Sequence, residues 1–179
     1  MAKHQIHNVG ILGGSFDPAH RGHLAISRIA IKKLKLKKVY WIVTKRNPFK
    51  KKSFFSIKKR IAKAKKIAKS IQKIQVLYID EIINSSRSID TIRYIFKYKK
   101  PKIVYFIIGS DILLDLHKWK DWRKLVKLTK LIVFSRKGYD KISKKTIVVK
   151  YLNKNKINFI RNKPIKISSS ALRKKMSKN

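Results

Sequence analysis

Residues 8–23 read Asn-Val-Gly-Ile-Leu-Gly-Gly-Ser-Phe-Asp-Pro-Ala-His-Arg-Gly-His, and this stretch decides the fold class. An apolar run ends in two glycines, a short polar loop follows, and apolar residues at helical spacing begin near Gly22. A strand, a tight turn and a helix in this order open an α/β sheet, in which ligands bind where the first strand ends. Gly13 and Gly14 let the backbone turn tightly and approach a ligand, as phosphate-binding loops require.

Apolar runs alternate with amphipathic basic segments along the rest of the chain. The pattern predicts helices at residues 22–35, 56–71, 88–98 and 169–176, while it is ambiguous at residues 148–156. It predicts strands at residues 8–12, 39–44, 74–79, 103–108, 131–135 and 157–160. Nearly continuous apolar strands indicate a parallel sheet that is buried on both faces. We therefore predict a single doubly wound, Rossmann-like α/β domain over residues 1–179.

The net charge of the 179-residue chain is +40, from 48 Lys and Arg against 8 Asp and Glu. A charge this high is typical of nucleic-acid-binding domains, and a coding bias toward Lys, Ile and Asn also produces it. Many basic residues fall at helical spacings, as at 58–60 and 63–69, which predicts solvated helix faces. We favour the compositional interpretation and expect no specific nucleic-acid partner.

The chain contains no cysteine, which excludes a disulfide-stapled fold and any site built on thiolates. No apolar run approaches the roughly 20 residues that cross a bilayer, and the first residues lack the apolar segment of a secretory signal. We expect a cytoplasmic protein without a membrane partner. The sequence does not indicate an oligomeric state.

His20 and His23 stand three residues apart at the predicted start of a helix. Both imidazoles can therefore project to the same side, where a helix N-terminus favours an anion. The spacing is neither that of a P-loop nor that of a dinucleotide fingerprint. A lone histidine here is usually a capping or surface residue, but residues 13–23 taken together indicate a phosphate-binding site.

Residues 13–23 resemble the G-G-x-F-x-P-x-H-x-G-H signature of a nucleotidyltransferase superfamily. From about residue 9 to residue 173 the chain resembles the nicotinate-nucleotide adenylyltransferases of that superfamily. The resemblance implies that His20 and His23 bind ATP phosphates and stabilise the transition state. Residues 167–173, Ile-Ser-Ser-Ser-Ala-Leu-Arg, resemble a second motif, I-S-S-T-x-x-R, with serine where threonine is usual, and this adds Arg173 to the catalytic set.

The middle of the chain resembles the nicotinate branch in particular. Residues 107–111 and 119–122 are similar to an I-G-x-D stretch followed by tryptophan, which implies that Asp111 contacts the ATP ribose and Trp119 stacks on the pyridine ring. Asp111 could instead cap the strand end, and Trp119 could be ordinary core. Residues 134–139 resemble an R-x-G-Y element that places Arg136 near the phosphates.

Two further segments resemble the parts of the family that bind the pyridine nucleotide. Residues 86–91 are similar to S-Y-T-x-D-T, whose third position, here Ser88, meets the nicotinate carboxylate, and Arg87 replaces the common tyrosine. Residues 47–50 resemble an N-P-x-H-K or N-P-L-K loop without its histidine. The resemblance thus assigns ATP binding to Gly13, Gly14, Ser15, Phe16, His20, His23, Gly109, Asp111, Arg136, Ser169, Ser170 and Arg173, and substrate binding to Asn47, Lys50, Ser88 and Trp119.

The implied reaction is transfer of the adenylyl group of ATP to nicotinate mononucleotide. We expect Mg²⁺ to be carried mainly by ATP phosphates, with no metal site of protein ligands and with only Asp17 and Asp111 near enough in the motifs to assist. Pantetheine-phosphate adenylyltransferase, which shares the first and last motifs, is an alternative, although it usually lacks a histidine at the position of His20 and does not need residues 109–122. A nonenzymatic nucleic-acid-binding protein is the alternative from another class, but the sequence has no signature of one.

Overall fold

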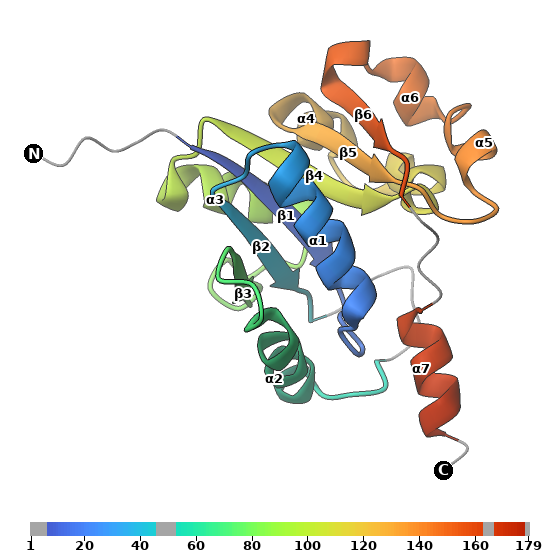
Figure 1. The fold of residues 1–179 in the computed structure, drawn as a ribbon. Helices are drawn as coiled ribbons and strands as arrows, with labels where there is room; N and C mark the ends of the chain where they lie inside the picture. Colours follow the sequence, from blue (N-terminus) through green and yellow to red (C-terminus); the bar gives the residue numbers. More distant parts are fainter. Residues whose placement is uncertain (1–6, 46–52, 163–166, 178–179) are drawn as a thin grey trace, which may run out of the picture.

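The computed structural model places residues 7–45, 53–162 and 167–177, and one six-stranded sheet organises them. Its strands lie in the order β3-β2-β1-β4-β5-β6, and every neighbouring pair is parallel. This confirms the predicted doubly wound α/β class (Figure 1). The strands are β1 (Asn8–Gly14), β2 (Lys38–Val43), β3 (Ile74–Leu77), β4 (Ile103–Gly109), β5 (Lys130–Phe134) and β6 (Ile157–Ile160).

Helices connect the strands and cover both faces of the sheet (Figure 1). At residues 148–156, where the sequence pattern is ambiguous, the chain forms most of one short helix and a single 3₁₀ turn. The helices are α1 (Arg21–Lys33), α2 (Ile57–Ala68), α3 (Ser88–Lys99), α4 (Trp122–Leu128), α5 (Asp140–Ser143), α6 (Ile147–Tyr151) and α7 (Ser169–Met176), with 3₁₀ turns η1 (Ile112–Leu114), η2 (Leu116–Lys118) and η3 (Lys154–Lys156).

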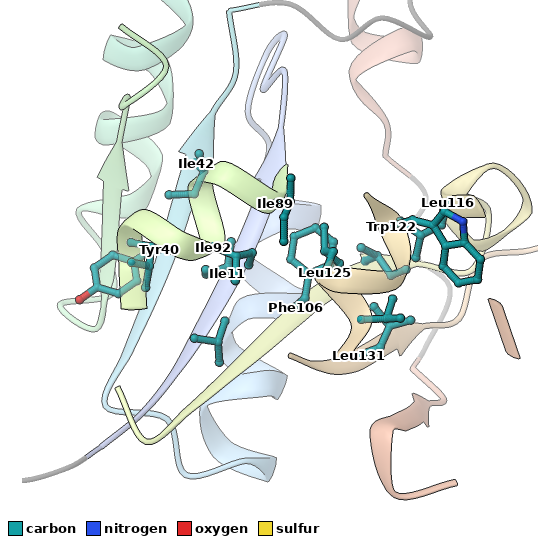
Figure 2. Close-up of a cluster of buried hydrophobic side chains, with 14 of the residues drawn as sticks. Ile11, Tyr40, Ile42, Ile89, Ile92, Phe106, Leu116, Trp122, Leu125 and Leu131 are labelled. Carbon is teal, nitrogen blue, oxygen red and sulfur yellow. The ribbon is translucent and has the colours of Figure 1, made fainter. Parts of the chain in front are cut away.

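Alternate strand residues pack into two separate hydrophobic clusters, because successive side chains of a strand point to opposite faces. In β4, Phe106 and Ile108 join the cluster beneath α3 and α4, which we call the α3-side cluster, and Ile107 joins the cluster beneath α1 and α2, the α1-side cluster. Figure 2 shows Ile89 and Ile92 of α3 packed in the α3-side cluster. Burial on both faces explains why the strands read as continuous apolar runs.

The sheet divides between its two central strands, which is where a ligand site is expected in this topology. β1 and β4 are paired only as far as Leu12 and Ile107. Beyond that pair β1 continues beside β2 as far as Gly14, and β4 continues beside β5 as far as Gly109. The carboxyl ends of β1 and β4 therefore bound an opening, with α1 beginning on one face of it and α3 on the other.

Candidate active site

A cleft of about 820 Å³ occupies this opening. Asn47 and Lys50 lie outside the described residues. All the other residues predicted for the site line the cleft, although they come from opposite ends of the sequence: Gly13, Gly14, Ser15, Phe16, His20, His23, Ser88, Gly109, Asp111, Trp119, Arg136, Ser169, Ser170 and Arg173. The structure thus brings together the residues that the motifs singled out.

The two histidines are built into the first turn of α1. His20 is the N-cap residue, and its Nδ1 accepts the backbone N–H of Gly22 at 3.1 Å, while its own N–H donates to Nδ1 of His23 at 3.1 Å. The ring centroids lie 3.9 Å apart, and Phe16 packs against His23 with a centroid separation of 4.8 Å. A ring nitrogen that accepts a hydrogen bond carries no proton, so the neutral rings are N–H donors at Nε2.

The pKa of His20 is lowered to about 4, first because burial disfavours the imidazolium and second because the charge of Arg136 repels it. His20 is therefore neutral near pH 7. It offers a phosphate a hydrogen bond from Nε2 and not a positive charge. Positive charge in the cleft wall comes instead from basic residues that include Arg136, Lys137 and Arg173.

A buried arginine supports the turn that follows β1. Arg60, only 2% exposed, donates from Nη1 to the carbonyls of Ser15 and Thr44, both at 2.7 Å. It also donates to the carbonyls of Lys45 at 3.1 Å and Phe55 at 3.2 Å. The prediction of a solvated face at residues 58–60 is therefore wrong for Arg60, because four carbonyls of neighbouring loops satisfy its guanidinium inside the protein.

Asp17 joins the loop before α1 to two distant segments. Its buried carboxylate accepts the backbone N–H groups of Phe54 at 2.8 Å and Phe55 at 2.9 Å, and the Asp17 carbonyl accepts Nη1 of Arg173 at 2.6 Å. Ser169 Oγ donates to the Pro18 carbonyl at 2.9 Å, which helps to dock α7 beside the start of α1. Asp17 is not among the residues that line the cleft, so its carboxylate organises the site from behind.

Asp111 and Arg136 meet across the carboxyl ends of β4 and β5. Arg136 Nη1 donates to Asp111 Oδ2 at 2.7 Å, and Asp111 Oδ1 is buried with no hydrogen-bond partner among the described residues. Within the part of the chain that the structure describes, Asp111 makes no side-chain cap to η1, and its carboxylate is instead engaged by Arg136. A Cβ at Gly109 would lie 2.5 Å from Asp111 Oδ1, so a glycine there leaves space for the carboxylate.

Asp140, which the sequence did not single out, fastens the loops after β4 and β5 together. Ser110 Oγ donates to Asp140 Oδ1 at 2.9 Å, and the backbone N–H of Arg136 donates to the same oxygen at 3.0 Å. Burial raises the pKa of Asp140, but the hydrogen bonds and nearby positive charge outweigh it and hold the pKa below its ordinary value. Asp140 is therefore ionised at neutral pH and positions the backbone that carries Arg136.

The other side of the cleft contains Ser88 and Trp119. Ser88 is the first residue of α3, and Trp119 follows η2. Trp119 is half-buried against the α3-side cluster, with its ring centroid 6.3 Å from that of Phe106, and it also lines the cleft. One part of the Trp119 side chain therefore belongs to the hydrophobic core, and another part faces the cleft, where a ligand could contact it.

Sequence reasoning missed several residues that line the cleft. Thr44 follows β2 and Asn162 follows β6, so both stand at carboxyl ends of strands, and this position was the signal that could have found them. The apolar walls, Leu12, Phe106, Ile107 and Phe134, gave no signal because their spacing is that of ordinary core. No helix among the described residues is long and apolar enough to cross a bilayer.

Comparison with known proteins decides the family. The sequence model of the cytidylyltransferase-like family matches residues 11–175. A protein of Pelagibacter ubique (strain HTCC1062), named as a probable nicotinate-nucleotide adenylyltransferase, is 48% identical over 166 residues, which are 93% of this chain and 92% of that protein. The chain belongs to the cytidylyltransferase-like family, in its nicotinate-nucleotide adenylyltransferase branch. A protein of the same name from Endomicrobium trichonymphae is 35% identical over 170 residues, 94% of this chain and 86% of its own length.

Solved structures of this branch share the fold. The Plasmodium falciparum nicotinic acid mononucleotide adenylyltransferase complexed with APC superposes with a TM-score of 0.73 at 21% identity. The same enzyme complexed with NaAD gives a TM-score of 0.71 at 22% identity. Each match covers 94% of this chain and 83% of the other. The predicted fold class and the predicted family are both confirmed.

Proposed function

We propose that this family member transfers the adenylyl group of ATP to nicotinate mononucleotide, which gives nicotinate adenine dinucleotide and pyrophosphate for NAD biosynthesis. One observation carries the proposal. A single cleft at the division of the sheet has phosphate-binding groups on its α1 side and an aromatic wall with a helix N-terminus on its α3 side. Such a cleft suits two nucleotides whose phosphates meet in the middle.

The α1 side of the cleft suits the triphosphate of ATP. The backbone of Gly13 and Gly14, the N-terminus of α1 and the Nε2–H donors of His20 and His23 converge there. Arg173, on the docked helix α7, brings a positive charge to the same side. Arg136 adds a second positive charge and is itself oriented by Asp111.

The reaction needs no covalent intermediate and no general base. A phosphate oxygen of the mononucleotide, already an anion, attacks the α-phosphorus of ATP. A new P–O bond forms, the bond between the α-phosphorus and its bridging oxygen breaks, and pyrophosphate leaves with that electron pair. Catalysis then consists of positioning two polyanions and stabilising charge in the transition state. His20, His23, Arg136 and Arg173 supply the donors for that task.

Mg²⁺ enters this proposal as part of the ATP substrate. Among the described residues, no group of three His, Cys, Asp or Glu side chains is placed to hold a metal ion. Asp111 is the one carboxylate among the described residues of the cleft wall, and Arg136 pairs with it, while Asp17 accepts two backbone N–H groups. These residues fit an ion that the triphosphate carries and whose chemistry is to neutralise phosphate charge.

The α3 side suits the pyridine nucleotide. Trp119 offers an aromatic face for stacking, and Ser88 offers a hydroxyl at the start of α3. Asn47 and Lys50 remain predicted substrate contacts on the strength of the sequence resemblance. The cytoplasm remains our expectation for the compartment.

The two alternatives are disfavoured by different observations. Phosphopantetheine has no planar ring for Trp119 to contact, and the relatives reported above carry the nicotinate-nucleotide name. A nucleic-acid-binding protein has no need of paired imidazoles in the wall of a nucleotide-sized cleft. The charge of +40 is distributed over many exposed lysines, for example on α2, in keeping with a compositional origin.

One assay separates these functions. The purified protein is incubated with ATP, Mg²⁺ and, in separate reactions, nicotinate mononucleotide, nicotinamide mononucleotide or phosphopantetheine, and the products are separated by chromatography. We expect dinucleotide and pyrophosphate, formed fastest with nicotinate mononucleotide. A His23→Ala preparation is the control for contaminating activity. Adenylylation of phosphopantetheine without any dinucleotide would contradict the proposal.

A further inference from the structure

We propose that Arg87 binds the carboxylate of the nicotinate ring and sets the preference for nicotinate over nicotinamide mononucleotide. The inference rests on the proposed function and deepens it. Arg87 is the N-cap residue of α3 and lines the cleft beside Ser86 and Ser88. Among the described residues, the Arg87 side chain makes no capping hydrogen bond to the backbone of α3.

The position of Arg87 is on the acceptor side of the cleft. Helix α3 packs through Ile89 and Ile92 into the α3-side cluster, and Trp119 packs against that same cluster. The glycine turn and the histidines belong to the opposite face, where Phe16 lies in the α1-side cluster. Arg87 and Trp119 therefore flank the part of the cleft that is left for the ring of the second nucleotide.

The Nε edge of the Arg87 guanidinium is hydrogen-bonded, and among the described residues its two terminal Nη groups are not. Its Nε donates to Asp90 Oδ2 at 2.7 Å and to Ser85 Oγ at 3.4 Å. Within residues 7–45, 53–162 and 167–177, no hydrogen bond or ion pair engages either terminal Nη group. The side chain is 48% exposed. A guanidinium held in this way presents two parallel N–H donors, the arrangement that a carboxylate accepts in bidentate fashion.

Neighbouring charges leave the region positive. Asp90 is shared by two arginines, since Arg93 Nη1 lies 3.4 Å from Asp90 Oδ1 while Arg87 holds Oδ2. Burial raises the pKa of Asp90. The hydrogen bonds from Ser85 and Arg87 and the charges of both arginines outweigh this effect and hold the pKa below its ordinary value, so Asp90 is ionised. Two guanidinium groups on one carboxylate leave one uncompensated positive charge.

The remaining charged groups near this position do not cancel that charge. Asp121, which feels the charges of Arg93 and Arg87, forms an ion pair with Lys124 at 2.9 Å. Lys118, on the cleft wall, forms an ion pair with Asp115 at 2.7 Å. Lys120 also lines the cleft and adds positive charge. The acceptor side therefore favours an anionic ring substituent.

This arrangement distinguishes the two pyridine substituents by chemistry. A carboxylate accepts from both Nη groups and matches the local charge. A carboxamide is neutral and presents an NH₂ group that only donates, so it opposes one of the two donors. Loss of a charge-assisted bidentate contact lowers affinity by roughly 10- to 100-fold. Arg87 is thus a specificity-determining residue for the second nucleotide.

The test compares two arginines that share one carboxylate. Arg87→Gln and Arg93→Gln each remove one partner of Asp90, but only Arg87 lines the cleft, whereas Arg93 lies in a shallow groove beside Tyr94 and Tyr98. Michaelis constants are measured for both mononucleotides and for ATP. We expect Arg87→Gln to raise the constant for nicotinate mononucleotide roughly 10- to 100-fold and to leave those for nicotinamide mononucleotide and ATP unchanged. Arg93→Gln should change none of them, and Arg87→Lys should restore part of the preference.

Three results would overturn the inference. The first is an unchanged ratio of the two mononucleotide constants in Arg87→Gln while the wild type is active. The second is that Arg87→Gln and Arg93→Gln change the Michaelis constants for the two mononucleotides by the same factors. That result would assign Arg87 a structural role through Asp90. The third is loss of the preference in Lys120→Gln but not in Arg87→Gln. A wild type that is inactive with both pyridine mononucleotides would overturn the proposed function itself.

Discussion

The imidazole rings of His20 and His23 lie 3.9 Å apart, and each uses its Nδ1 to accept a backbone N–H at the start of α1. The same hydrogen bonds that cap the helix therefore determine which nitrogen of each neutral ring carries the proton. The Nδ1 atoms of both rings therefore stabilise the start of the helix, and Nε2–H is the remaining ring donor that we propose His20 offers to a phosphate.

His20→Asn should separate the two roles of His20. Asparagine is a good N-cap residue, so the melting temperature should stay near that of the wild type, whereas His20→Ala should lose about 1 kcal/mol of stability. Both variants lack the Nε2–H donor, so both should lower kcat by roughly 10²- to 10³-fold. Thermal unfolding and steady-state kinetics measure these effects. Near-normal turnover in a folded His20→Asn protein would remove His20 from the catalytic set.

The titration of His20 should be displaced far from that of a solvated histidine. Its pKa in the folded protein is about 4 and the ordinary value is 6.5. Between about pH 4 and pH 6.5, His20 is therefore protonated in the unfolded chain but not in the folded protein. The contribution of His20 to stability is therefore fully present above about pH 6.5, declines as the pH falls to about 4, and levels off below.

NMR titration of the free protein measures this pKa directly, with the His20 signal identified by its absence in His20→Asn. The free energy of unfolding of His20→Asn should also fall less than that of the wild type between pH 7 and pH 4. A midpoint near 6.5 for His20 would contradict the burial and the Arg136 repulsion that we describe.

Trp119→Ala should raise the Michaelis constant for nicotinate mononucleotide by roughly 10-fold, because a stacked aromatic contact is worth about 1 kcal/mol or more. The constant for ATP should change little, since Trp119 lies on the α3 side of the cleft. Trp119→Phe, which keeps an aromatic face and part of the contact with Phe106, is the matched control and should retain most of the affinity. If the alanine variant instead loses ATP binding, Trp119 does not act through the pyridine ring.

Arg60→Met should lower the free energy of unfolding by about 3 kcal/mol, because it leaves buried carbonyls at Ser15, Thr44, Lys45 and Phe55 without their donor. Lys59→Met alters the exposed neighbour on the same helix and should be nearly neutral. Urea unfolding of both variants measures the difference. Equal stability of the two variants would show that the loops do not depend on the guanidinium.

The parts of the site that could be predicted from sequence are those whose chemistry is local. A few consecutive residues are enough to predict the local geometry of such motifs. Examples are the glycine turn after a strand, the two histidines one helical turn apart and the serine cluster before an arginine. Arg60 and Asp140 could not be found in this way, because their partners lie far along the chain or in irregular loops. Arg60 follows two exposed lysines, and only the packing of α2 against the loops shows that it points inward.

The fold was predictable for a similar reason. Strands buried on both faces, such as β2 and β5, need apolar side chains at most positions, and short apolar runs in the sequence show this. Ends of elements were less accurate, as at β3, which stops at Leu77 rather than at residue 79. Beyond Leu77 the chain serves tertiary contacts instead of the sheet, since Asp80 accepts the backbone N–H of Lys45.

The division of the cleft between two hydrophobic clusters bears on how such a protein changes over evolutionary time. The glycine turn and the histidines, which we propose bind ATP, lie on the layer beneath α1 and α2, and Arg87 and Trp119, which we propose bind the mononucleotide, lie on the layer beneath α3 and α4. A mutation in one layer that shifts its helix leaves the other layer supported by its own contacts. Acceptor choice can therefore drift through α3 and the segment around Trp119 while the adenylyl donor stays the same, so one ancestral scaffold can give rise to enzymes that share a cosubstrate and differ in the molecule that they adenylylate.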